Sequence, residues 1–136
     1  MEFSTYILFP IFILFASHCI GDYPFQGEFL AKYKAENNFI LLVHCTIYTA
    51  IILLGFWVIS FIGYCKDWNA DSFAHASYAI LFSHFIIDKL KCEYRKSLEK
   101  TYGDLNSEEA HKDDVFGFYA DQAAHMVIIL FVSILV

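Results

Sequence analysis

Four segments of the chain are almost free of charged residues, and most polar residues lie in the connections between them. The apolar segments cover residues 3–22, 39–63, 72–90 and 116–136. A helix needs about 20 consecutive apolar residues to cross the hydrocarbon core of a membrane. The pattern therefore predicts an all-α, polytopic membrane protein with four transmembrane helices packed as a bundle. No linker divides the chain, so residues 1–136 are expected to form a single integral membrane domain.

The two longer connections, residues 23–38 and 91–115, differ in pattern. In the first, Phe25, Phe29 and Tyr33 recur at every fourth position with charged residues between them, which predicts an interfacial amphipathic helix. The second mixes both signs of charge and predicts a solvated loop or short helix with a turn near Gly103.

Composition and charge narrow the class of protein. The chain is 58% apolar and 18% charged, which is too apolar for a soluble domain, so the lipid bilayer is the expected partner. The net charge of −6 leaves no basic surface for a nucleic-acid backbone, so nucleic acid is excluded as a partner. The four cysteines form no CxxC motif and are expected to be free thiols.

The basic residues also predict an orientation. Eight of the nine lie in the connections after the first and third spans, and only Lys66 lies on the opposite side: the eight are Lys32, Lys34, Lys89, Lys91, Arg95, Lys96, Lys100 and Lys112. Positively charged connections tend to stay in the cytoplasm. The connections 23–38 and 91–115 are therefore expected to be cytoplasmic loops of a multi-pass protein in the cell inner membrane, with both termini outside.

Ionisable residues inside the predicted spans form pairs four residues apart: His18 with Asp22, His84 with Asp88, and Asp121 with His125. Residues at this spacing share one helix face. His44 adds a fourth histidine near the start of the second span. Because successive spans alternate in direction, all seven residues are expected at a similar depth near the cytoplasmic face. In a four-helix bundle, they can converge on one polar site.

Four imidazoles and three carboxylates make a ligand set that suits a divalent metal ion. Zinc is favoured, with manganese or iron as alternatives, and one or two ions are expected, two if an aspartate bridges them. The alternative is that these side chains simply hydrogen-bond between helices without a metal. Burying so many charged groups without a counter-ion is expensive, which favours the metal.

Other polar residues flank this set. Lys91 and Tyr48 are candidate catalytic groups: Lys91 to hold an anionic substrate group or to neutralise Asp88, and Tyr48 as a proton donor, with aromatic packing as its alternative. Candidates for supporting the ligands or contacting substrate are Gln26, Lys32, Asn38 and Gln122.

The ordered motifs resemble a known family. They are HCIGDYPFQ from His18, FLAKYK from Phe29, Asn38, LLVHCTIY from Leu41, HFIIDKLK from His84 and DQAAH from Asp121. In this order they are similar to a bacterial and phage membrane-protein family catalogued as domain of unknown function 3307. That family is in turn distantly similar to YdjM-type membrane-bound metal-dependent hydrolases. The resemblance implies an architecture and candidate residues, but no substrate.

Three functions remain open from the sequence. The first is a metal-dependent hydrolase that acts on a lipid-linked or phosphate-containing, small anionic substrate. The second is a divalent-cation or proton transporter, which at this length would need to form a homo-oligomer. The third is a small phage or defence-type membrane effector in which the metal is structural.

Overall fold

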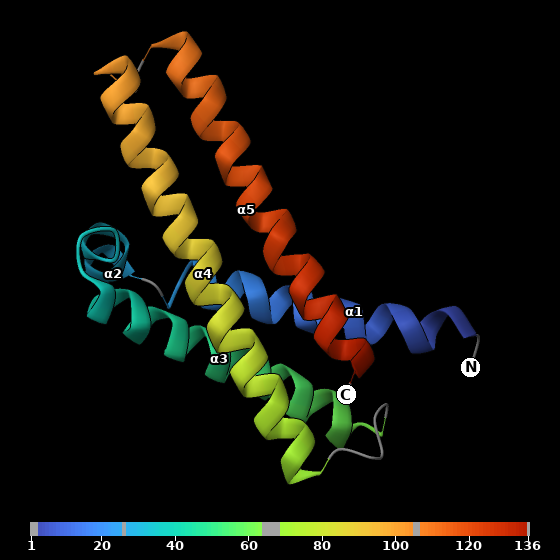
Figure 1. Ribbon diagram of the computed structural model, residues 1–136. Helices are drawn as coiled ribbons and strands as arrows, with labels where there is room; N and C mark the ends of the chain where they lie inside the picture. The colour runs from blue at the N-terminus through green and yellow to red at the C-terminus, as the bar shows by residue number, and fades with distance from the viewer. Residues whose placement is uncertain (1–2, 26, 64–68, 105–106, 136) are drawn as a thin grey trace.

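The computed structural model describes residues 3–25, 27–63, 69–104 and 107–135, and these contain helices and turns but no strand. Five α-helices follow one another: α1 (Phe3–Asp22), α2 (Gly27–Tyr33), α3 (Asn38–Phe61), α4 (Ala70–Tyr102) and α5 (Glu108–Leu135) (Figure 1). The all-α class predicted from the sequence is confirmed. A short helix, α2, also lies where an amphipathic helix was expected.

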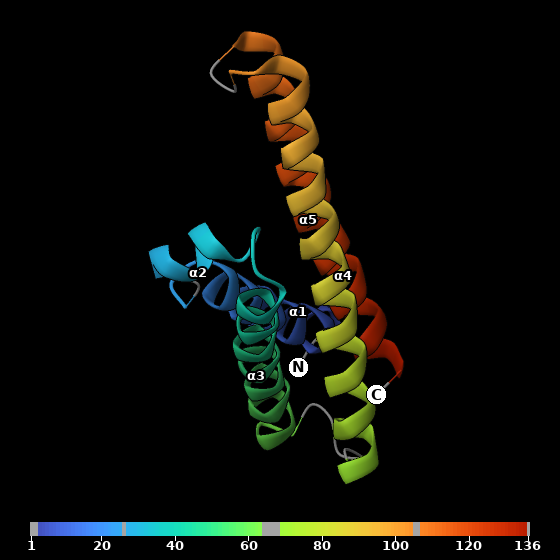
Figure 2. The same cartoon turned by 60° about the vertical axis from the view of Figure 1, so that its left-hand side comes forward.

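The long helices form two antiparallel pairs. α1 packs against α3, α4 packs against α5, and contacts between α3 and α4 join the pairs. Both ribbon views show the α4–α5 hairpin extending well beyond the other helices at its connecting end (Figures 1 and 2). The middle of this hairpin, rather than its tip, therefore meets the end of α1 and the start of α3.

Among the described helices, only two of the four predicted spans combine the length and the apolar content needed to cross a membrane. In the part of the chain described, α3 over Asn38–Phe61 and α5 over Glu108–Ser133 are long and apolar enough to cross a membrane. The apolar part of α1, Leu8–Asp22, is shorter. α4 is long, but its first turns contain Asp71 and His75, which lower its apolar content. The structure thus supports two candidate spans where the sequence predicted four.

Of the two alternatives predicted for residues 91–115, a solvated loop or a short helix, the structure shows helix for most of the range. α4 continues to Tyr102 and α5 begins at Glu108. Ion pairs one helical turn apart stabilise these exposed turns: Lys89 with Glu93 at 3.4 Å, Lys96 with Glu93 at 3.1 Å, and Lys112 with Glu108 at 2.7 Å. The change from apolar to charged residues therefore shows where the helix surface becomes polar and exposed, and not where the helix ends.

The reversal between α4 and α5 begins at Gly103, as the sequence predicted. Its φ of 71° lies in the left-handed region that glycine adopts at little cost, and its amide donates to the Glu99 carbonyl at 3.0 Å. The Tyr102 hydroxyl donates to the Asp113 carboxylate at 2.9 Å, and this hydrogen bond raises the pKa of Tyr102. This hydrogen bond connects the end of α4 to the start of α5.

Small residues let α1 and α3 approach closely. A methyl group added at Gly55 would lie 2.4 Å from Ser17 Oγ, and one added at Gly21 would lie 2.8 Å from the Tyr48 ring. Neither position can hold a larger side chain without displacing its neighbour. This contact brings the end of α1, with His18 and Asp22, against the first turns of α3.

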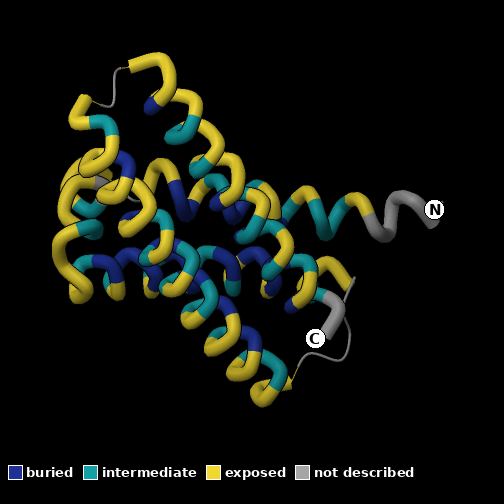
Figure 3. The backbone as a smooth tube through the Cα atoms, turned by 45° about the horizontal axis from the view of Figure 1, so that its top comes forward, coloured by how far each residue is buried: buried dark blue, intermediate teal, exposed yellow. Residues whose placement is uncertain are grey.

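The apolar core lies to one side of the polar residues. It includes Leu14, Tyr48, Ile52, Phe56, Ile59, Ala76, Ile80, Ile129 and Val132. Each of the four long helices also has an exposed outer face (Figure 3), and large apolar side chains are among the exposed residues: Phe12 on α1 is 65% exposed, Leu54 on α3 59%, Phe82 on α4 73% and Val127 on α5 63%. The helices are therefore apolar both toward one another and toward their surroundings.

Candidate metal centre

The structure brings all seven of the predicted histidine and aspartate residues together. They come from the end of α1, the start of α3, the middle of α4 and the middle of α5. Each is at most 8% exposed: His18, Asp22, His44, His84, Asp88, Asp121 and His125. Helical spacing of four and alternating chain direction are enough to place them at one level.

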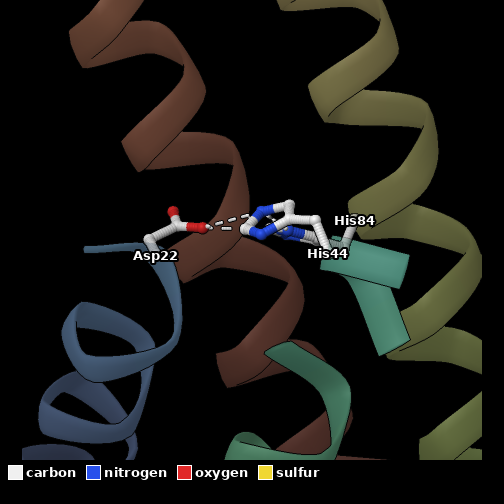
Figure 4. Close-up of side chains that lie close together, drawn as sticks. All are labelled: Asp22, His44 and His84. Carbon is white, nitrogen blue, oxygen red and sulfur yellow. Dashed lines mark hydrogen bonds and ion pairs between the residues drawn. The ribbon is translucent and has the colours of Figure 1, made fainter. Parts of the chain in front are cut away.

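Three ligand atoms in this cluster, from Asp22, His44 and His84, face one another at the separations expected around one metal ion. The His44 and His84 Nε2 atoms are 3.1 Å apart, and Asp22 Oδ1 lies 3.5 and 3.8 Å from them (Figure 4). Asp88 Oδ2 lies 3.3 Å from His44 Nε2 and 3.9 Å from His84 Nε2. Ligand atoms around tetrahedral zinc at about 2.05 Å lie about 3.3 Å from one another. Asp22, His44 and His84 could therefore hold a metal ion with little movement, and Asp88 lies beside both histidines.

A second group of three consists of His84, Asp88 and His125, and it shares His84 with the first. His125 Nε2 lies 3.8 Å from Asp88 Oδ1, which is the carboxylate oxygen not directed at His44. Each carboxylate oxygen of Asp88 is thus close to a different histidine. A carboxylate placed in this way can bridge two metal ions.

The hydrogen bonds of His125 point its other nitrogen into the cluster. Its Nδ1 lies 2.9 Å from the backbone carbonyl of Asp121, to which it donates, so Nε2 carries the lone pair. Nε2 is buried, has no hydrogen-bond partner among the described residues, and is directed at Asp88. A lone pair that faces a buried carboxylate oxygen is unfavourable unless a cation or proton lies between them. Metal-binding histidines are commonly oriented by such a bond to a carbonyl.

A separate hydrogen-bond chain orients the carboxylates. The Tyr48 hydroxyl donates to His18 Nδ1 at 2.9 Å, and His18 Nε2 donates to Gln122 Oε1 at 2.9 Å. The Gln122 amide donates to Asp121 Oδ2 at 3.0 Å and to Asp22 Oδ2 at 3.5 Å. Both ring nitrogens of His18 are therefore engaged, and this histidine supports the carboxylates instead of directing a free lone pair at the cluster.

The Tyr48 side chain has two contacts in the cluster. Its ring stacks on the His84 imidazole, with centroids 3.7 Å apart and planes 6° from parallel, while its hydroxyl reaches His18. The side chain is 1% exposed. Tyr48 therefore fixes the orientation of one candidate ligand and starts the chain that orients two carboxylates.

Two lysines neutralise carboxylates of the cluster. Lys91 Nζ donates to Asp121 Oδ2 at 2.6 Å, and Lys34 Nζ donates to Asp88 Oδ2 at 2.7 Å. The sequence identified Lys91 as a candidate, but with Asp88 as the carboxylate that it would neutralise; the structure pairs Lys91 with Asp121 and places Lys34, which the sequence did not indicate, on Asp88. Lys34 follows α2, and only the turn of the chain back into α3 places it over α4, so no periodic spacing connects it with Asp88.

Two of the remaining candidates, Asn38 and Lys32, contact residues outside the cluster. The exposed Asn38 accepts a hydrogen bond from Lys89 at 2.9 Å. Lys32 is exposed too, and its ammonium lies 5.4 Å from the centre of the Tyr33 ring. Gln26 lies outside the described residues. Cys19, Cys45 and Cys92 are free thiols, as predicted, and Cys65 also lies outside the described residues.

Comparison with known proteins places the chain in a family without giving it an activity. No curated protein sequence and no solved structure matches it. A family model described as a protein of unknown function, DUF3307, matches residues 10–136, which include every member of the cluster. The chain is therefore a member of the DUF3307 family.

Proposed function

We propose that the protein is a metal-dependent hydrolase of the cytoplasmic membrane that acts on a lipid-linked or other phosphate-containing substrate. The observation that carries the proposal is the convergence of Asp22, His44, His84 and Asp88. Asp22 Oδ1 and Asp88 Oδ2 each lie 3.3 to 3.9 Å from the Nε2 atoms of His44 and His84, which are 3.1 Å apart, in a buried site where facing lone pairs and carboxylate oxygens would be unfavourable without a cation.

The apolar outer surface supports insertion of all four long helices. Monomeric soluble proteins rarely expose large contiguous apolar areas. Here each long helix exposes large side chains, such as Phe15 (49%), Trp57 (54%), Tyr78 (72%) and Phe131 (57%). A bilayer would cover these faces, and the shorter α1 and more polar α4 would enter it packed against α3 and α5. The positively charged connections would face the cytoplasm.

The donor set favours zinc as the ion. Two imidazoles and two carboxylates in a tetrahedral arrangement suit zinc, and manganese or iron would also accept these ligands. Asp88 Oδ1 and His125 Nε2 offer a place for a second ion next to the first. We assign His18 and Gln122 to the orientation of the carboxylates, because both ring nitrogens of His18 are hydrogen-bonded.

Charge in the cluster favours an anionic substrate. Among the described residues, the carboxylates of Asp22, Asp88 and Asp121 are accompanied by the ammonium groups of Lys34 and Lys91. A divalent ion would turn the excess of one negative charge into an excess of one positive charge. When bound, the ion would polarise a phosphoryl oxygen and lower the pKa of bound water toward about 7. Lys91, at the edge of the cluster, would neutralise negative charge on the phosphoryl oxygens.

The packing of the helices supports a transporter less well than a hydrolase. A transport path would need polar groups on both sides of the cluster. On one side, the core is built from apolar residues such as Leu14, Ile52, Phe56 and Ile80. Hydrolysis needs access from one side only, which fits this arrangement better.

Turnover that depends on metal tests the proposal. The protein, purified in detergent and stripped by a chelator, would be assayed for phosphate release from a short-chain phosphatidic acid and from p-nitrophenyl phosphate. We expect no release without metal and recovery of turnover on addition of Zn²⁺, Mn²⁺ or Fe²⁺.

Absence of release with every one of these ions, from protein shown to have bound them, would contradict the hydrolase. Metal binding without turnover would favour a structural metal and the effector function. Metal-dependent flux into proteoliposomes would instead favour the transporter.

A further inference from the structure

A basic pocket lies against the cluster, between the turn that follows α2 and the middle of α4. Its volume is about 310 Å³. In the described part of the chain, five basic residues line it: Lys32, Lys34, Lys91, Arg95 and Lys96. Glu36 and Glu99 are the acidic residues at its wall, and Lys34 and Lys91 are paired with Asp88 and Asp121, which leaves an excess of one positive charge. A pocket of this charge would attract a polyvalent anion.

A second pocket lies between α4 and α5 and is apolar. Its volume is about 280 Å³, and its lining includes Ile87, Leu90, Phe116, Ala120 and Ala124. Lys91 and Asp121 are its charged residues. The outer faces of both helices beside it expose apolar side chains, including Leu90 at 65% and Phe116 at 70%. A hydrocarbon chain could enter this pocket directly from a surrounding bilayer.

Lys91 lines both pockets and also binds the cluster through Asp121 at 2.6 Å. Lys34, in the wall of the basic pocket, binds Asp88 at 2.7 Å. From this juxtaposition we propose that the two pockets together form a binding site for an anionic amphiphile. Its phosphate headgroup lies among the lysines beside the metal centre, and its hydrocarbon chain lies between α4 and α5.

The existing ion pairs of the basic pocket leave it able to bind an anion. Arg95 lies 3.9 Å from Asp114 and Lys96 lies 3.1 Å from Glu93, and these side chains are 61% and 45% exposed. Exposed pairs of this kind contribute little stability. A phosphate carries more charge and more acceptor oxygens than one carboxylate, so it competes for both cations. Lys91 is 32% exposed, and its ammonium is close enough to the pocket to turn from Asp121 to a bound anion.

The two halves of the site make separate contributions to affinity. The lysines recognise the phosphate, and a hydrocarbon chain placed in the apolar pocket adds affinity in proportion to the apolar surface removed from water. Neither contribution needs the metal. This site extends the proposed function by naming the substrate class, and it rests on that function only for the claim that the bound molecule is hydrolysed.

Calorimetric titration of three probes in dodecyl maltoside micelles tests the site, with metal-free and metal-loaded protein. The probes are dodecyl phosphate, glycerol 3-phosphate, which lacks the chain, and dodecyltrimethylammonium, which has the opposite charge. We expect dodecyl phosphate to bind at least about 10-fold more tightly than either of the others. Equal affinity for the two phosphates would overturn the role of the apolar pocket, and equal affinity for the two dodecyl probes would overturn that of the lysines.

Two variants and their matched controls locate the site. Arg95→Gln with Lys96→Gln removes two charges from the pocket and should weaken dodecyl phosphate binding about 5-fold. Lys100→Gln with Lys112→Gln removes two charges outside the pockets and should leave affinity unchanged. Ala120→Phe should block the chain, whereas Ala123→Phe, on the same helix but outside the pocket lining, should not.

A loss of affinity that is equal in variants and controls would contradict the site. Binding that follows these expectations in a protein without turnover would retain the site and refute the hydrolase. Turnover of chain-free phosphate esters, with no preference for binding dodecyl phosphate, would retain the hydrolase and refute the site.

Discussion

Asp88→Asn should reduce affinity for a divalent ion more than 100-fold while leaving the helical content unchanged. The Asp88 side chain is 2% exposed, and its oxygens lie 3.3 Å from His44 Nε2 and 3.8 Å from His125 Nε2. Asparagine has the same shape but no charge, so it replaces an anionic ligand with a weak neutral one. Loss of residues that merely orient ligands costs about 10- to 100-fold in metal affinity, so loss of a direct ligand should exceed that range.

The matched control for this change is Asp71→Asn. Asp71 lies on the same helix, is exposed and is remote from the cluster, so the same substitution should leave metal affinity unaltered. Metal content after dialysis and competition with a chromophoric chelator provide the measurement. Native affinity in Asp88→Asn would show that this carboxylate is not a ligand.

Removal of the metal should lower the stability of the folded protein by several kcal/mol. A ligand that binds only the folded state stabilises it by about 4 kcal/mol when present at 1,000 times its dissociation constant. For a chain of this size, such a change corresponds to a shift in the unfolding midpoint on the order of 10 °C. The measurement is thermal unfolding followed by circular dichroism in detergent, with excess Zn²⁺ and with chelator.

The variant His84→Gln tests whether the stabilisation by metal arises from an ion bound at the cluster or from metal bound elsewhere on the protein. His84 belongs to both groups of candidate ligands, so its loss should abolish the stabilisation by metal. His75→Gln changes an exposed histidine on the same helix and should retain it. If metal raised the midpoint of His84→Gln as much as that of the native chain, the stabilisation would arise elsewhere.

The cluster could be found from the sequence because its geometry is local and repeated. Spacings of four place His18 with Asp22, and His84 with Asp88, on single helix faces, and alternating chain direction sets their common depth. The structure adds what spacing cannot give. Lys34 reaches Asp88 from a turn, and both nitrogens of His18 are engaged by Tyr48 and Gln122.

Helix length was the least predictable part of the fold. Apolar content indicates where a chain can meet lipid, but ion pairs between charged side chains continue α4 to Tyr102 and start α5 at Glu108. The basic pocket depends on this helix length. Arg95 and Lys96, for which the sequence left a loop or a short helix open, lie on the continuous helix α4 and line the pocket together with Lys34.

X-ray absorption spectroscopy of the zinc-loaded protein tests the central claim most directly, because it reports the atoms bound to the ion. We predict a shell of nitrogen and oxygen atoms at about 2.0–2.1 Å, with the outer-shell scattering of at least two imidazoles and no sulfur at about 2.3 Å. The described free thiols, including the buried Cys45, belong to neither group of candidate ligands. A sulfur ligand, or an oxygen shell without imidazole scattering, would contradict the histidine and aspartate centre.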